Sequence, residues 1–149
     1  MKCIVTNSKS TKVRVGNITV GSIDKGMLIL VGFTHNDDYE VIKKMVRKIV
    51  NLRIFPDDND VMNKSIVDIE GSILSVSQFT LYADTKKGAR PSYKDAMPGK
   101  EAKELYDLFN DELRKYVHVE TGVFGENMVL ENNNIGPTTI ILEINNERK

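Results

Sequence analysis

Apolar residues in the first third of the chain follow the patterns of β-strands. Segments 3–8 and 12–23 are short runs rich in β-branched residues, and Gly16-Asn17 interrupts the second run with a dipeptide typical of hairpin turns. Residues 27–35 form a nearly continuous apolar run, which is typical of a strand buried on both faces. We therefore predict a hairpin followed by a central strand.

The spacing of apolar residues changes to that of an α-helix after this strand. Asp37 or Asp38 stands where an acidic side chain can cap a first turn. The apolar stripe that follows consists of Val41, Ile42, Met45, Val46, Ile49 and Val50. A second amphipathic helix is predicted over residues 99–116, with inward positions at Ala102, Leu105, Leu108, Phe109 and Leu113.

The remaining segments complete the predicted order of elements. Residues 72–82 are predicted as one strand, and residues 118–144 as two or three strands separated by glycine and asparagine. This order indicates an α+β fold with a largely antiparallel, barrel-like sheet and two main amphipathic helices. No repeat or low-complexity linker divides the chain, so we expect residues 1–149 to form one domain.

Composition and charge exclude several classes of protein. The apolar content of 40% and the charged content of 28% are those of a globular protein. Lys plus Arg equals Asp plus Glu at 21 each, so any binding of nucleic acid has to come from a local patch. Cys3 is the only cysteine, which excludes an internal disulfide framework. No segment has the apolar core of a signal peptide or the roughly 18 apolar residues of a membrane span, so we expect a cytoplasmic protein without a membrane partner.

Side chains that usually carry catalysis or bind metal are few. His35 and His118 are the only histidines, and neither has the spacing of a zinc ligand pair. Each stands at the end of a predicted strand, which favours a structural role. The acidic residues at 57–60 lack the glycine and final glutamate of a calcium-binding loop, and we interpret them as a solvated loop. We therefore predict no metal site and no cofactor.

Neutral polar residues interrupt the predicted strand at 72–82. Ser77, Gln78 and Thr80 stand among apolar residues, and in a strand Gln78 and Thr80 face the side opposite to Ser77. These side chains can be partners for a bound ligand, or they can form the hydrated face of a half-exposed strand. The pattern alone leaves both interpretations open.

Two other segments are equally ambiguous. The loop after this strand places Lys86, Lys87 and Arg90 among tyrosines, an arrangement that suits a nucleic-acid backbone with a stacked base but also occurs in basic loops without function. Residues 131–144 place three asparagines and a Gly-Pro pair before a buried strand. This pair is either an ordinary hairpin corner or part of a site for a small polar ligand.

Two of these segments together resemble motifs of the D-aminoacyl-tRNA deacylase family. The motifs are Ser77-Gln78-Phe79-Thr80-Leu81 and Asn134-Ile135-Gly136-Pro137-Thr138-Thr139. Segments 51–55, 87–93 and 120–125 also fall in the order and spacing that the family shows, so the likeness covers nearly the whole chain. The resemblance implies a homodimeric cytosolic hydrolase of translation proofreading. Such an enzyme binds aminoacyl-tRNA and no DNA, and cleaves the ester between a D-amino acid, or mischarged glycine, and the terminal adenosine.

The resemblance also implies roles for individual residues. The Gly136–Pro137 bond would be cis and would reach into the active site of the other subunit, where carbonyl oxygens hold the α-ammonium group of the substrate. A D side chain would then point outward, whereas an L side chain would strike the pocket wall. The implied catalytic residues are Ser77, Gln78, Phe79 and Thr80. The implied substrate-binding residues are Asn134, Gly136, Pro137, Thr139 and Met128, and the implied tRNA contacts are Lys86, Lys87 and Arg90.

Two chemical routes are compatible with these residues. In both, backbone N–H groups around Phe79 and Thr80 would stabilise the oxyanion that forms at the ester carbonyl. Thr80 is the only plausible side-chain nucleophile, but no base is evident to activate it. Assistance from the ribose 2′-hydroxyl of the tRNA fits this absence, so we favour substrate-assisted hydrolysis over an acyl-enzyme on Thr80.

Two positions depart from the family pattern. Asn7 stands where members usually carry an arginine that braces the Gly-Pro loop, so we expect a looser grip and weaker rejection of L substrates. Thr138 replaces the usual valine, a change of similar shape that we expect to be tolerated. The departure at Asn7 keeps an alternative function open, a catalytically weakened tRNA-binding homodimer on the same scaffold.

Overall fold

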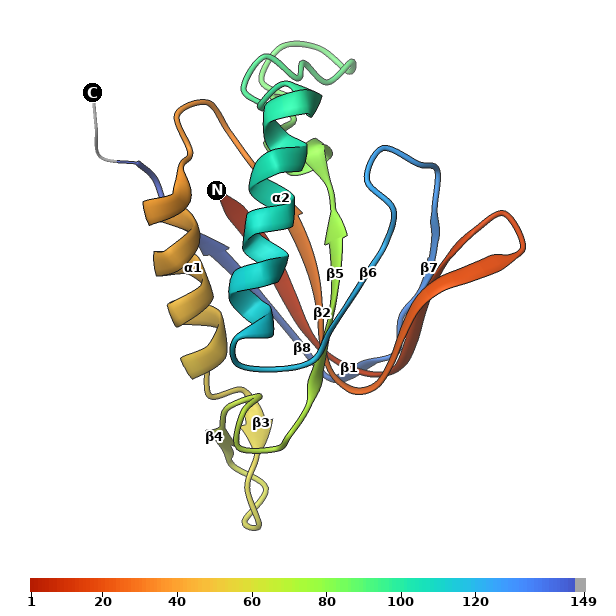
Figure 1. Cartoon of the computed structure of the whole chain (residues 1–149), viewed down its shortest axis with the longest axis vertical. Coiled ribbons are helices and arrows are strands. Elements are labelled where there is room, and N and C mark those ends of the chain that lie inside the picture. The colour runs from red at the N-terminus through yellow and green to blue at the C-terminus, as the bar shows by residue number, and fades with distance from the viewer. Residues whose placement is uncertain (147–149) are drawn as a thin grey trace.

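The N-terminal hairpin forms the centre of the structure. The computed structural model describes residues 1–146. β1 (Lys2–Val15) and β2 (Ile18–Gly32) are long antiparallel strands joined at the predicted turn (Figure 1). The predicted hairpin is confirmed, and the separate runs seen in the sequence are parts of two continuous strands.

The main sheet is mixed. Its strands lie in the order β6 (Val119–Thr121), β5 (Ser72–Ser77), β2, β1 and β7 (Val129–Glu131), and β8 (Asn134–Glu143) also pairs with β1. β1 is antiparallel to its three partners, whereas β2 with β5 and β5 with β6 are parallel. Each parallel pair is connected through a helix, the crossover that parallel strands need. A separate small hairpin consists of β3 (Phe55–Pro56) and β4 (Met62–Lys64).

Both predicted helices are present, and one inward position is wrong. α1 (Tyr39–Asn51) begins after Asp38, whose carboxylate accepts a hydrogen bond from the Val41 N–H at 3.1 Å, and its predicted apolar stripe is buried throughout. α2 (Gly99–Arg114) buries Phe109 and Leu113, but Leu108 is 40% exposed. The buried stripe of α2 runs instead through Tyr106, because this side chain reaches the sheet and donates to the carbonyl oxygen of Ser75 at 2.7 Å. Within residues 1–146, no helix has the length and apolarity to cross a membrane.

The two helices cover one face of the sheet (Figure 1), and the main core lies between these layers. The predicted burial of the central strand on both faces is confirmed, since Met27 and Ile29 belong to this core and Leu28 to a second cluster on the opposite face. Part of that opposite face stays open, because Ile141 on β8 is 68% exposed. The sheet therefore presents an apolar surface that its own helices do not cover.

Candidate functional site

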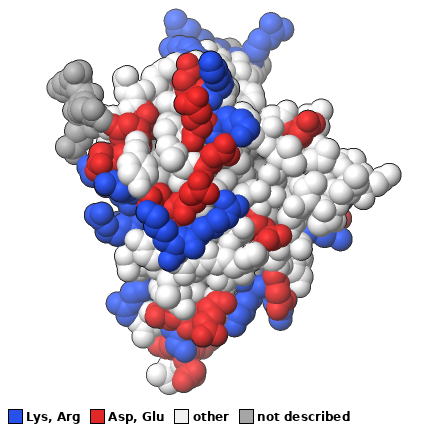
Figure 2. Space-filling model, in the orientation of Figure 1, with Lys and Arg blue, Asp and Glu red and all other residues white. Residues whose placement is uncertain are grey.

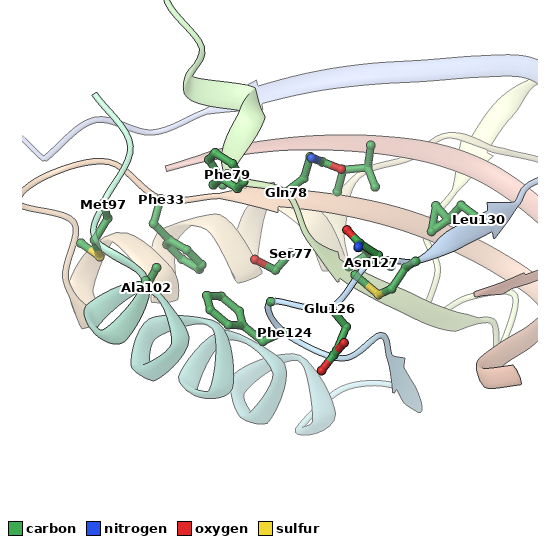
Figure 3. Close-up of a pocket in the computed structure, with 16 residues that line it drawn as sticks. Phe33, Ser77, Gln78, Phe79, Met97, Ala102, Phe124, Glu126, Asn127 and Leu130 are labelled. Carbon is green, nitrogen blue, oxygen red and sulfur yellow. The ribbon is translucent and has the colours of Figure 1, made fainter. Parts of the chain in front are cut away.

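A cavity of ≈ 690 Å³ lies where β2 and β5 end, beside the first turn of α2. Figure 3 shows Phe33, Ser77 and Phe124 pointing toward one another between α2 and the sheet. The lining is mostly apolar with a few polar groups, as in sites for small organic ligands. Its polar side chains are Ser77, Gln78, Glu126 and Asn127, and its apolar residues include Leu30, Val76, Met97 and Met128.

The chain changes from strand to helix at the edge of this cavity. The predicted strand over residues 72–82 is wrong beyond Ser77, because Phe79–Tyr82 forms a short 3₁₀-helix, η1. Pairing with β2 ends at Ser77, and the Gln78 N–H closes it by donating to the carbonyl oxygen of Val31 at 2.7 Å. Gly32 makes room for the turn, since a β-carbon there would lie 2.9 Å from the Gln78 carbonyl oxygen.

This helix leaves two backbone donors free beside the cavity. The first N–H groups of a helix have no carbonyl acceptor within it. In η1, Leu81 N–H donates to Gln78 at 3.3 Å and Ala83 N–H to Thr80 at 3.1 Å, but the N–H groups of Phe79 and Thr80 find no acceptor among residues 1–146. In a continuous strand, these groups would alternate between the two edges of the sheet. The 3₁₀ turn instead presents consecutive amides.

Thr80 is held by its neighbour. Its side chain is exposed, and its hydroxyl oxygen accepts a hydrogen bond from Nε2 of Gln78, which lines the cavity. An amide nitrogen only donates, so the Thr80 hydroxyl keeps its own proton for another acceptor. The hydroxyl is oriented by this contact, which does not remove its proton.

The histidines and the cysteine do not line the cavity. His35 donates from Nε2 to the carbonyl oxygen of Lys94 at 2.7 Å, and Nε2 of His118 lies 2.7 Å from the Glu120 carboxylate. Burial raises the pKa of the Cys3 thiol, which keeps it protonated. Among residues 1–146, no three His, Cys, Asp or Glu side chains are placed to hold a metal ion.

Met128 lies in the cavity, as do several residues that the sequence did not indicate. Its sulfur accepts a weak hydrogen bond from the Val123 N–H at 3.4 Å. The cavity residues that sequence reasoning missed include Phe33, Met97, Phe124, Glu126 and Asn127. Of these missed residues, only Phe124 falls in a segment that the family resemblance had indicated, 120–125, because the walls come from strands, a helix and a loop that are far apart in the chain.

The predicted Gly-Pro turn lies outside the cavity of its own chain. Gly136 and Pro137 are exposed near the start of β8, and neither lines the cavity. The peptide bond between them is cis. The four substrate-binding residues predicted on this segment are therefore not brought together with Gln78 and Phe79 within one chain.

The side chains of the three asparagines before this turn form hydrogen bonds with other residues of the same chain. Oδ1 of Asn132 accepts from the hydroxyls of Ser8 at 2.8 Å and Thr11 at 3.0 Å. Nδ2 of Asn133 donates to the carbonyl oxygen of Ser10 at 3.1 Å. Asn134 makes two side-chain hydrogen bonds within its own strand, to the backbone N–H of residue 138 and the hydroxyl of residue 139.

The basic loop lies between η1 and α2. Its residues Lys86, Lys87 and Arg90 are exposed and form no ion pair within residues 1–146. Lys and Arg side chains gather at the top of Figure 2, where Figure 1 draws this loop. Asp84 anchors the loop by accepting from the Lys86 N–H at 3.0 Å, and this bond holds the pKa of the Asp84 carboxyl below its usual value.

Comparisons with known proteins agree over nearly the whole chain. A family model described as D-Tyr-tRNA(Tyr) deacylase matches residues 4–143. A D-aminoacyl-tRNA deacylase of Anoxybacillus flavithermus (strain DSM 21510 / WK1) is 47% identical over 144 residues, which cover 96% of this chain and 99% of that protein. A solved structure described as c-Myc DNA Unwinding Element Binding Protein has a TM-score of 0.93 at 37% identity and covers 98% of this chain and 100% of its own. A structure described as a probable eukaryotic D-amino acid tRNA deacylase has a TM-score of 0.82 at 19% identity, covers 96% and 98%, and shows a shared fold.

These matches define the class of the protein as a hydrolase that acts on ester bonds, with aminoacyl-tRNA as the substrate class that the family implies. The chain belongs to the D-aminoacyl-tRNA deacylase family, which confirms the resemblance carried by the two sequence motifs.

Proposed function

We propose that the protein hydrolyses the ester between a D-amino acid, or glycine, and the 3′-terminal adenosine of tRNA, and rejects L-aminoacyl-tRNA by means of Gly136–Pro137 from a second copy. The free N–H groups of Phe79 and Thr80 carry the proposal. They are the donors that a developing oxyanion needs, and one such donor typically contributes about 2.7–4 kcal/mol to transition-state stabilisation.

The hydrolysis needs no side-chain nucleophile. Water adds to the ester carbonyl carbon, and the oxyanion is stabilised by the two amides. The ribose 2′-hydroxyl takes a proton from the water and returns one to the leaving 3′-oxygen, so the carbon–oxygen bond breaks to release the amino acid and free tRNA. Gln78 and Ser77, which line the cavity, shape the pocket and orient the ester.

Two copies complete each site. The Gly136–Pro137 turn is exposed together with its neighbour Ile135, which is 44% exposed, and the helix-free face of the sheet carries Ile141 at 68% exposure. Burying these side chains against a second copy stabilises a two-fold dimer. In this dimer, the turn of one copy reaches the cavity of the other.

Selection by handedness follows from a fixed grip on the amino group. Carbonyl oxygens of the turn accept hydrogen bonds from the α-ammonium group, and this contact leaves one open direction for the side chain. An L side chain meets the wall, and steric exclusion discriminates more strongly than added attraction. Glycine has no side chain to exclude and is also cleaved.

Assays with D-Tyr-tRNA and L-Tyr-tRNA test the function. We expect rapid release of tyrosine from the D ester and much slower release from the L ester. Release from neither, with tRNA binding retained, would support the alternative of a catalytically weakened tRNA-binding homodimer. In the same assay Thr80→Ala should keep much of the activity, and an inactive Thr80→Ala variant would favour an acyl-enzyme on Thr80.

The basic loop should contribute to tRNA affinity through phosphate contacts. Replacing Lys86, Lys87 or Arg90 by glutamine should each lower the slope of log affinity against log salt by about 0.7–0.9, because one fewer counterion is released. Filter binding over a salt series measures this slope. Lys103→Gln is a matched control, since Lys103 is on α2 and is paired with Asp107 at 2.8 Å. An unchanged slope in the three loop variants would refute the assignment.

A further inference from the structure

The Gly136–Pro137 turn belongs to a large bulge of β8, at the point where the register of its pairing with β1 shifts. Thr139 lies opposite Thr6, and Asn134 lies opposite Ser8. Five steps along β8 thus correspond to two steps along β1, so three extra residues leave the sheet. Bulged residues lose their ladder partners, and something else has to hold them in a single conformation.

The Asn134 side chain spans this bulge. Its Oδ1 accepts from the Thr138 N–H at 3.0 Å, and its Nδ2 donates to the Thr139 hydroxyl at 2.8 Å. A backbone N–H only donates, so the amide oxygen has to face Thr138 and the amide nitrogen Thr139. Both polar groups of Asn134 are therefore used to close the chain around residues 135–137.

The neighbouring strand β1 does not hold the bulged residues in place. If the pairing of Thr6 with Thr139 continued by one residue, Thr138 would lie opposite Asn7. The register shifts at this point, and the Thr138 N–H donates to the Asn134 side chain. The Asn7 side chain makes no hydrogen bond with any residue of the described range 1–146. Gly136 and Pro137 are exposed, so burial does not fix them either.

We infer that Asn134 is the positioning residue of the turn: its amide holds the Gly136–Pro137 carbonyl groups in the orientation that grips the α-ammonium group, and so sets the selectivity between D and L esters. The inference rests on the proposed function for its catalytic consequence. It gives Asn134 and Thr139 the role of holding the turn, whereas the sequence motif suggested that they contact the substrate. The Asn134 side chain holds the turn through its two hydrogen bonds, and the Asn7 side chain forms no hydrogen bond with the turn among residues 1–146.

Amide hydrogen exchange followed by NMR tests the brace without any substrate. The Thr138 N–H should be protected in the wild-type protein, and its exchange should become about tenfold faster in Asn134→Ala, since one hydrogen bond is lost. Asn134→Asp should keep the protection, because a carboxylate accepts from the Thr138 N–H and also from the Thr139 hydroxyl. Asn133→Ala, which removes a bond to the Ser10 carbonyl from the same connection, should leave Thr138 unchanged.

The same variants give the catalytic consequence. Asn134→Ala should lower D-Tyr-tRNA cleavage by about 10- to 100-fold, because the turn is no longer held in one place, and should lower the ratio of D to L cleavage at least tenfold. Thr139→Val removes one of the two bonds and should give an intermediate ratio. Asn133→Ala should keep the wild-type ratio.

The outcomes separate the two proposals. If the Thr138 N–H exchanges rapidly in the wild type, or stays fully protected in Asn134→Ala, then Asn134 does not hold the turn. This conclusion does not depend on the activity of either protein. A protected Thr138 that is released in Asn134→Ala, together with an unchanged ratio of D to L cleavage, overturns the role in selectivity. An inactive wild-type protein with the expected exchange pattern overturns the proposed function and leaves the brace in place.

Discussion

Phe79→Pro should lower kcat for D-Tyr-tRNA by about 100- to 1,000-fold, whereas Phe79→Ala should retain most of it. Proline has no N–H, so the first variant removes one of the two free amides, and the loss of one oxyanion donor has this size. Alanine keeps the amide and removes only the side chain. The difference between the two variants therefore isolates a backbone group.

The position is suited to this substitution. Phe79 is the first residue of η1, where proline is favoured because its fixed φ matches a helix and its missing N–H has no helical acceptor. Gln78 is not helical, with φ −145° and ψ 87°, so a following proline does not force it out of an α conformation.

The side-chain loss is common to both variants. The Phe79 ring packs edge-on against Tyr93 with the ring centroids 5.0 Å apart, and this contact disappears in each. Single-turnover rates and thermal unfolding should be measured on both proteins. Equal rates in Phe79→Ala and Phe79→Pro would remove the backbone oxyanion donor from the mechanism.

Gly136→Ala should lose D-ester cleavage by about 100-fold or more while the protein stays folded. The φ angle of Gly136 is +117°, a region that residues with a β-carbon rarely adopt. A β-carbon here would also lie 2.6 Å from Oγ1 of Thr138 and 3.1 Å from its backbone nitrogen. The turn has to shift to accommodate it, and displacement of a binding group by about 1 Å can cost this much in rate.

Gly16→Ala is the matched control for this variant. Gly16 has a φ of +57° at the hairpin turn between β1 and β2, and nothing lies within 4 Å of an added β-carbon. It introduces a positive-φ alanine away from the cavity and should leave the rate unchanged. Rates and dimer mass should be measured for both variants. Wild-type activity in Gly136→Ala would exclude the turn as the grip on the amino group.

Much of the scaffold was predictable from local patterns. The buried stripe of α1 and its cap at Asp38 depend on residues within one or two helical turns of each other, so their spacing in the sequence contains the information. The central strand predicted over residues 27–35 was predictable as far as Gly32, where β2 ends, because its continuous apolar run matches burial on both faces. The two sequence motifs were sufficient to indicate the family.

The change at Ser77 was not predictable in this way. Phe79, Leu81 and Tyr82 suit a strand, and the polar residues around them are also compatible with the hydrated face of a strand, so the pattern does not show where the strand ends. The strand stops because its pairing with β2 ends there and Gly32 leaves space for a tight turn. A partner strand about 45 residues earlier in the chain therefore decides whether the amides beside Thr80 are free.

The sequence by itself determined the two long helices and the long strands of the N-terminal hairpin, since periodicity and capping act over a few residues. The tertiary structure decided which polar groups are free and which are used by the chain. Asn132 illustrates this, because its position beside the Gly-Pro pair suggested a ligand contact, whereas its amide oxygen accepts hydrogen bonds from the hydroxyls of Ser8 and Thr11 at the other end of the chain. Hydrogen-bond partners depend on which strands meet and in which register, and these contacts join residues that are far apart in the sequence.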